Sequence, residues 1–206
     1  MLDLYCERLG PGLLAEPRNA FTNLAFLLAA LHAWHAADGR QDVRVLAALI
    51  AVIGLGSGLF HTLATRGAQW CDVVPIGLFQ LSFLWLYLRR VRELTAPACA
   101  AWLALFILAL AVAAPLTAPL NGSLAYAPAL LALTALGVAH LRRLRDPGLL
   151  LAAALFLASL TARSLDLALC PRWPAGTHFL WHLLNALLLG RLAQVYARAS
   201  ASLTLR

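Results

Sequence analysis

Two histidines near the C-terminal end of the chain have the spacing of a metal-binding pair. His178 and His182 are four residues apart, and on a helix this spacing places both side chains on one face, one turn apart. His61, from a distant part of the sequence, offers a third imidazole. Three histidines can hold zinc and leave its fourth position to a water whose pKa falls to about 7. The pattern therefore predicts a zinc site of the catalytic type.

Other polar side chains in apolar stretches support this interpretation. Such residues are costly inside a membrane and mark functional sites. Most of them lie at one end of their stretch, and up-and-down threading would bring those ends to one side: Ser57, His61, Asp72, Arg163, Asp166, His178 and His182. The shared depth favours one polar cluster. Arg163 and Asp166 are three residues apart, and we expect them to neutralise each other within the bundle.

The run from Gly54 to His61, GLGSGLFH, fits two interpretations. Ser57 precedes His61 by four residues, so the two share a helix face beside the predicted metal. The glycines would also let a neighbouring helix approach closely, as in an ordinary packing seam. The run alone does not decide between a catalytic serine and a packing motif.

The elements that must position these residues are apolar helices. Of the 206 residues, 62% are hydrophobic and 12% are charged, whereas about a quarter of the residues in soluble domains are charged. Seven stretches approach the ~20 residues that a helix needs to cross about 30 Å of hydrocarbon. They are Ala20–Ala37, Val43–Leu63, Val73–Leu88, Ala96–Pro115, Leu124–Leu141, Gly148–Leu169 and His178–Ala197. We therefore predict a single domain, residues 1–206, folded as an all-α bundle of seven transmembrane helices.

The basic residues predict the orientation of this bundle. All sixteen are arginines, and they give a net charge of +7. Eleven lie on the side of the C-terminus and four on the side of the N-terminus, mostly in short loops. This bias places the C-terminus in the cytoplasm, the N-terminus outside and the polar cluster towards the non-cytoplasmic side. The arginines are explained by membrane orientation, so we expect no nucleic-acid partner.

Four blocks of the sequence resemble the alkaline ceramidases, which belong to a superfamily of seven-span putative hydrolases that includes adiponectin-receptor-like proteins. The blocks occur in the family order between residues 5 and 182. They are Tyr5-Cys6-Glu7 with Ala15-Glu16-Pro17-Arg18-Asn19 and Thr22-Asn23; Gly56-Ser57 with His61, Gln69 and Asp72; Arg163, Asp166 and Cys170; and His178 with Trp181-His182.

The resemblance implies a role for each cluster residue. His61, His178 and His182 would bind zinc, Asp72 would take and return the proton of the attacking water, and Ser57 would steady the charge on the amide oxygen. Amide hydrolysis needs these three services. A carboxylate near a metal can instead orient a ligand or the water, and this alternative for Asp72 stays open.

The resemblance also implies a calcium ion and a disulfide near the N-terminus. Glu7 and Glu16 correspond to carboxylate ligands of calcium, although Leu4 stands where an aspartate is expected. Calcium needs six to eight oxygens, and the sequence does not supply them all. Alternatively, Glu7 and Glu16 are solvated or cap the first helix. The implied disulfide joins Cys6 to Cys170, with Cys71 as a competing partner.

The sequence thus predicts a zinc-dependent hydrolase that cleaves the amide bond of ceramide or a related N-acyl lipid. The products would be a fatty acid and a long-chain base, and the setting a bacterial inner membrane. One alternative is a non-enzymatic receptor or scaffold whose zinc is structural, which predicts a closed metal site without a route for lipid. Another is a haem or transport protein, which predicts histidines that face each other across the bundle.

Overall fold

The computed structural model describes residues 1–116 and 119–204 and consists of helices joined by short loops. Their order is α1 (Pro17–Thr22), α2 (Leu24–His35), α3 (Gln41–Leu63), α4 (Arg66–Arg90), α5 (Ala96–Ala113), η1 (Pro119–Tyr126), α6 (Ala127–Leu144), α7 (Gly148–Leu169) and α8 (His178–Thr204). Over these two ranges the chain forms no strand. The predicted all-α class is therefore confirmed.

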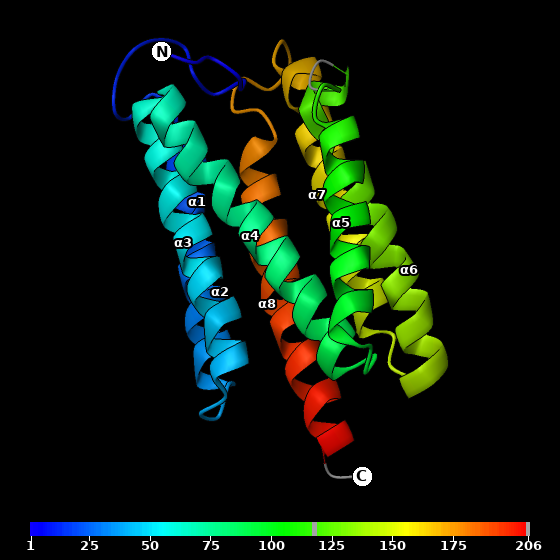
Figure 1. The fold of residues 1–206 in the computed structure, drawn as a ribbon. Coiled ribbons are helices and arrows are strands. Elements are labelled where there is room, and N and C mark those ends of the chain that lie inside the picture. Colours follow the sequence, from blue (N-terminus) through cyan, green and yellow to red (C-terminus); the bar gives the residue numbers. More distant parts are fainter. Residues whose placement is uncertain (117–118, 205–206) are drawn as a thin grey trace.

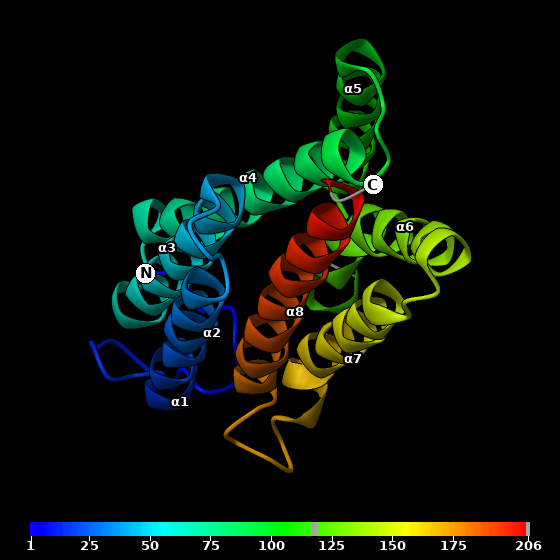
Figure 2. The same cartoon turned by 90° about the horizontal axis from the view of Figure 1, so that it is seen from below.

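Helix α8 lies in the middle of the arrangement (Figures 1 and 2). It packs against α7 on one side and against α2 and α3 on the other. The N-terminal segment, residues 1–16, crosses the end of the bundle near the start of α8 (Figure 1). The predicted polar cluster therefore lies beneath a strap of chain that precedes the first helix.

Within residues 1–116 and 119–204, five helical segments are long and apolar enough to cross a membrane, namely α3, α4, α5, η1 together with α6, and α7. Helix α2 has 12 residues, and α8 carries His178, His182 and Asn185 among its apolar side chains. Many large apolar side chains are exposed, for example Leu55 and Leu131, as expected for a surface that meets lipid. The chain is therefore an integral membrane protein by helix length and composition. The count of seven spans and the orientation of the termini stay predictions.

Several predicted spans differ from the helices observed: the fifth begins inside η1, α8 continues beyond Ala197 to Thr204, and the third and first differ most. The third span was expected to begin at Val73, but α4 begins at Arg66, where the Thr65 hydroxyl caps the helix by accepting a bond from Ala68 N. Asp72 consequently lies inside α4 rather than at its start. The first span is divided at Asn23 into α1 and α2, because Asn23 N bonds to the carbonyl three residues earlier and its side chain to Asn19 O.

Helices α3 and α4 touch at a point where neither has a side chain between the backbones. Pro75 lies inside α4 and has no N–H to bond the carbonyl of Cys71, four residues earlier. Gly56 of α3 faces that carbonyl so closely that a Cβ atom on it would lie 1.9 Å from Cys71 O. The glycine and the proline together let the two helices approach, and this approach brings Ser57 and His61 beside Asp72.

Replacement of Gly56 by alanine should therefore separate α3 from α4 and destabilise the protein. Overpacking of a core costs typically about 1–3 kcal/mol, and here the neighbouring atoms are backbone atoms that cannot rotate away. Gly77→Ala in α4 is the matched control, because a Cβ atom there meets nothing within 4 Å. Thermal unfolding in detergent micelles should show a lower midpoint for Gly56→Ala only. Equal midpoints for both variants and the wild type would contradict this account of the contact.

Candidate metal centre

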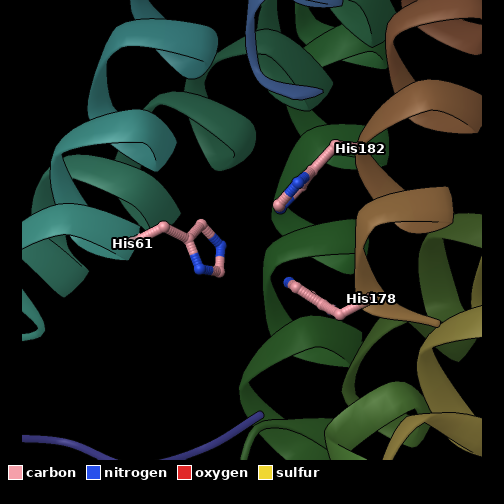
Figure 3. A group of neighbouring side chains, drawn as sticks. All are labelled: His61, His178 and His182. Atoms are coloured by element: carbon pink, nitrogen blue, oxygen red, sulfur yellow. The ribbon is translucent and has the colours of Figure 1, made fainter. Parts of the chain in front are cut away.

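Three histidine side chains from two helices point at a common centre (Figure 3). His61 lies near the end of α3, while His178 and His182 lie on the first two turns of α8. Each offers a ring nitrogen, and these three atoms lie within 4.8 Å of one another. None of the three side chains is more than 2% exposed. In the part of the chain that the structure describes, this is the cluster of His, Cys, Asp or Glu suited to a metal ion.

The donor set fits a metal ion because each imidazole has a buried nitrogen without a hydrogen-bond partner. These atoms are Nε2 of His61, Nδ1 of His178 and Nε2 of His182. Buried polar groups nearly always have partners, so three neighbouring exceptions need one. A zinc ion accepts lone pairs from three such nitrogens and has a strong preference for imidazole.

The other ring nitrogens of two histidines are held by residues of the N-terminal part of the chain. Glu16 Oε2 lies 2.5 Å from His61 Nδ1, and Thr22 Oγ1 lies 3.0 Å from His182 Nδ1. The Thr22 hydroxyl donates its one proton to Arg18 O, at 2.7 Å, so its oxygen accepts from the histidine. Both contacts place the proton on Nδ1 and leave Nε2 free for a metal, as such partners do in metal sites.

Glu16 is ionised at neutral pH. Burial alone would raise the pKa of its carboxyl, but hydrogen bonds from its neighbours, with His61 the strongest, lower this pKa below its ordinary value. The carboxylate is buried, at 2% exposure, and both of its oxygens accept bonds from side chains. A carboxylate bonded to the imidazole of a metal ligand increases the basicity of that ligand.

Tyr5 packs against the third histidine. Its ring is stacked on the His178 ring with a centroid distance of 3.6 Å, and its hydroxyl accepts a 3.0 Å bond from Arg163 Nη1. Burial raises the pKa of Tyr5 to about 12, so the phenol is neutral. The stacking fixes the plane of the His178 ring, which, among the residues that the structure describes, has no side-chain hydrogen-bond partner like those of His61 and His182.

The expected pairing of Arg163 with Asp166 is wrong, because the two side chains have different partners. Asp166 accepts bonds from three backbone N–H groups, those of Cys6 at 2.9 Å, Thr177 at 2.7 Å and His178 at 2.9 Å. Arg163 instead lies over aromatic rings, including Tyr5 at 5.5 Å. Asp166 thus joins the N-terminal segment to the start of α8, a tertiary role that three-residue spacing does not reveal.

Cys6 and Cys170 form a disulfide, and Cys71 and Cys99 are free. The disulfide ties the N-terminal segment to the end of α7, only four residues beyond Asp166. Two links of different chemistry therefore hold the segment over the histidines.

Asp72 and Ser57 line a cavity next to the histidine cluster. The cavity is also lined by His182, and Ser57 lies within hydrogen-bonding reach of the Asp72 carboxylate. Asp72 does not belong to the group of metal-binding side chains found among the described residues. Asp72 therefore lies beside the predicted metal position without being one of its ligands, which fits both a proton carrier and a group that orients the water.

Glu7 and Glu16, the residues assigned to calcium, have separate partners. Glu7 accepts bonds from Arg18 N and Asn19 N, each at 2.8 Å. These are free N–H groups of the first turn of α1, which Glu7 therefore caps, as the alternative interpretation of this residue predicts. Among the described residues, neither Glu7 nor Glu16 lies with two further carboxylate, histidine or cysteine side chains in a group that could hold a metal ion.

The parts that Thr22, Tyr5 and Arg8 have in the site were not predicted from the sequence. Thr22 and Tyr5 lie within the blocks that carry the family resemblance, but nothing in their spacing relative to the histidines indicates contact. Tyr5 is 6% exposed and Arg8 is 3% exposed. Burial of these polar side chains arises from how residues 1–16 fold back over the bundle, and no local pattern encodes that path.

Thr22→Val should weaken zinc binding without a loss of shape, because valine keeps the volume and removes the oxygen that holds His182 Nδ1. Loss of such a partner typically costs about 10–100-fold in metal affinity, and Thr22→Ser should largely retain the affinity. Thr62→Val is the matched control, since the Thr62 hydroxyl bonds only to carbonyls of its own helix. Competition with a zinc-chelating dye measures the affinities. A Thr22→Val protein that binds zinc like the wild type would refute the assigned contact.

Comparison with known proteins identifies the family of the chain. A search among curated protein sequences gave no match. The ceramidase family model, in contrast, matches residues 11–190, a range that contains all three histidines, Ser57 and Asp72. Because the match extends over most of its length, the chain belongs to the ceramidase family.

Proposed function

We propose that the protein is a zinc-dependent amidohydrolase that cleaves the amide bond of ceramide or a related N-acyl lipid. Membership of the ceramidase family suggests amide hydrolysis in a lipid. The observation that carries the proposal is that the histidine cluster adjoins an apolar cavity which Asp72 and Ser57 also line. A metal site, a proton carrier and a binding place for hydrocarbon thus meet at one point.

The cavity has a length along α8 and an apolar lining that suit a hydrocarbon chain. It follows α8 from His182 to Leu192, which is ~15 Å at the rise of an α-helix. Its walls are apolar over most of this length and come from helices α2 to α8, with Phe26, Ile53, Phe79, Phe83, Leu133, Phe156 and Leu188 among the lining residues. Hydrocarbon would displace no well-bound water there, so the cavity favours a long acyl or alkyl chain.

The residues around the cavity divide the chemistry of hydrolysis among them. When bound, zinc supplies a water of lowered pKa and a Lewis acid at the head of the cavity. Asp72 accepts the proton of the attacking water and passes it to the nitrogen of the leaving amine. Ser57 turns its hydroxyl from Asp72 to the amide oxygen as charge develops there. Water thus adds its hydroxyl to the acyl carbon and its proton to the amine.

The two alternatives fit these observations less well. A scaffold with structural zinc needs a closed site, whereas this cluster adjoins a cavity lined by Asp72 and Ser57. A haem protein needs histidines that face each other across a porphyrin, whereas His178 and His182 lie one turn apart on the same helix, α8. We also propose that residues 1–206 form one domain in a bacterial inner membrane. The metal site would lie on the non-cytoplasmic side, as the arginine distribution predicts.

His61→Ala and Asp72→Asn separate metal binding from hydrolysis. Wild-type protein should hold one zinc ion per chain by elemental analysis and release fatty acid from at least one member of a panel of N-acyl lipids. His61→Ala should lose both properties. Asp72→Asn should retain zinc and lose about 10²–10⁴-fold in rate, the usual contribution of a general acid–base group.

His35→Ala is the control for the histidine variant, because His35 is exposed at the far end of α2. It should bind zinc and hydrolyse lipid like the wild type. Purified wild type without zinc, or Asp72→Asn with an unchanged rate, would remove the mechanism. Zinc-replete wild type that is inert on every lipid of the panel would favour the receptor alternative.

A further inference from the structure

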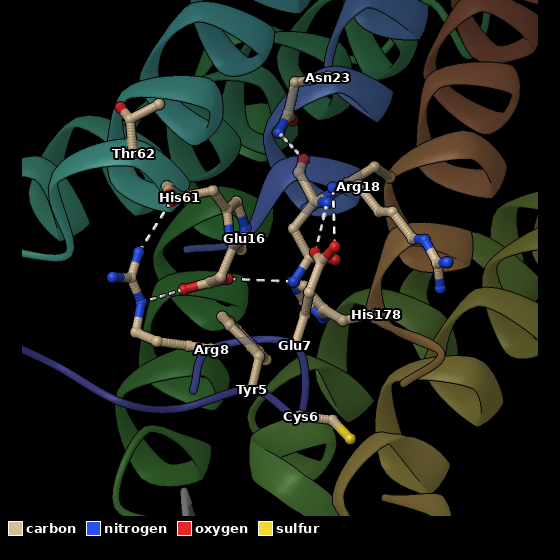
Figure 4. A network of polar contacts seen from close by, with 12 residues as sticks. Tyr5, Cys6, Glu7, Arg8, Glu16, Arg18, Asn23, His61, Thr62 and His178 are labelled. Atoms are coloured by element: carbon tan, nitrogen blue, oxygen red, sulfur yellow. Dashed lines mark hydrogen bonds and ion pairs between the residues drawn. The ribbon is translucent and has the colours of Figure 1, made fainter. Parts of the chain in front are cut away.

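The oxygens near Glu16 that could bind a calcium ion already accept hydrogen bonds from the guanidinium of Arg8. The Arg8 side chain extends beneath His61, at the end of α3, and is nearly completely buried (Figure 4). Arg8 Nε donates to Glu16 Oε1 at 2.5 Å, Nη2 donates to His61 O at 2.9 Å and Nη1 donates to Gly10 O at 3.5 Å. One carboxylate and two backbone carbonyls are the kinds of oxygen that calcium binds.

The residues around this position do not fit calcium. The ion needs six to eight oxygen ligands, but Glu7 directs both carboxylate oxygens at the backbone of α1. Glu16 is shared between Arg8, Asn19 and His61. A divalent cation at Glu16 would also lie beside the buried guanidinium and be repelled by it.

We propose that Arg8 is a built-in cation that takes the place of calcium in this protein. Its planar group donates several hydrogen bonds in fixed directions, so it can hold a carboxylate and two carbonyls as an ion would. It holds Glu16 within the N-terminal segment and joins that segment to the end of α3 and, through Glu16, to the ring of His61. The protein therefore needs no calcium to order the N-terminal segment over its metal centre.

Arg8 is a positioning residue, because it acts on the histidine through Glu16. Arg8 holds Oε1 of Glu16 while Oε2 accepts from His61 Nδ1 and from Asn19 Nδ2. Loss of Arg8 would leave a buried carboxylate without its counter-charge, which is strongly unfavourable. The predicted effect on zinc rests on the proposed function, whereas the predicted absence of bound calcium does not.

Calcium binding to the wild-type protein tests the first half of the proposal. Protein purified in buffer freed of divalent ions should bind no calcium in equilibrium dialysis with radioactive calcium. Its midpoint of thermal unfolding should not change when calcium is added at millimolar concentration. Stoichiometric binding, or a rise of the midpoint with calcium, would overturn the proposal whether or not the protein hydrolyses lipid.

Arg8→Ala with added guanidinium ion tests the second half. The variant should bind zinc about tenfold more weakly in competition with a chelating dye, at the lower end of the range for indirect partners of a metal ligand. Millimolar guanidinium should restore the affinity, because the ion fits the vacated place, and Arg8→Lys should retain part of it. Wild-type affinity in Arg8→Ala, or a loss that guanidinium does not restore, would contradict the proposal.

Two controls make the rescue specific. Arg18→Ala removes an exposed arginine whose side chain points away from the network (Figure 4), and it should leave zinc affinity unchanged. Thr22→Val weakens the site at a different histidine, so guanidinium should not restore it. Rescue of Thr22→Val by guanidinium would show a general effect of the ion and overturn the interpretation of Arg8.

Discussion

The rest of this structure depends on one constraint: His61, His178 and His182 each have a buried ring nitrogen that finds no hydrogen-bond partner among the described residues. A buried polar atom that lacks a partner costs a free energy of about 1–3 kcal/mol. The side chains that bond two of these rings come from distant parts of the sequence. Glu16 and Thr22 fix the proton on Nδ1 of His61 and His182. The site therefore presents lone pairs inward, an arrangement that a cation stabilises and that an apolar core would not.

The framework around the site serves to bring α3 and α8 together and to cover their ends. Gly56 and Pro75 remove the atoms that would keep α3 from α4. Asp166 and the disulfide of Cys6 hold the N-terminal segment against the start of α8. The segment places Tyr5 against His178. On our proposal it also places the Arg8 guanidinium beside Glu16, the carboxylate that bonds His61. Residues that precede every helix thus complete a site built on helices.

Local patterns in the sequence predicted the parts of the structure that depend on local physics. Apolar length predicted α7 from Gly148 to Leu169 with the observed bounds, and the four-residue spacing of His178 and His182 predicted that they share a face. The start of α4 was missed because its first turns, Arg66 to Asp72, are polar and a proline follows. Whether a carboxylate caps a helix, binds a guanidinium or faces a metal depends on tertiary contacts. The sequence therefore left the cap by Glu7 as one of several interpretations, and the roles of Arg8 and Asp166 could not be predicted.

X-ray absorption spectroscopy at the zinc edge of the purified protein tests the central claim most directly. The account predicts one zinc ion per chain with four nitrogen or oxygen scatterers at about 2.0–2.1 Å and the outer-shell pattern of three imidazoles. A sulfur scatterer at about 2.3 Å, fewer than three imidazoles, or protein that retains no zinc would contradict it.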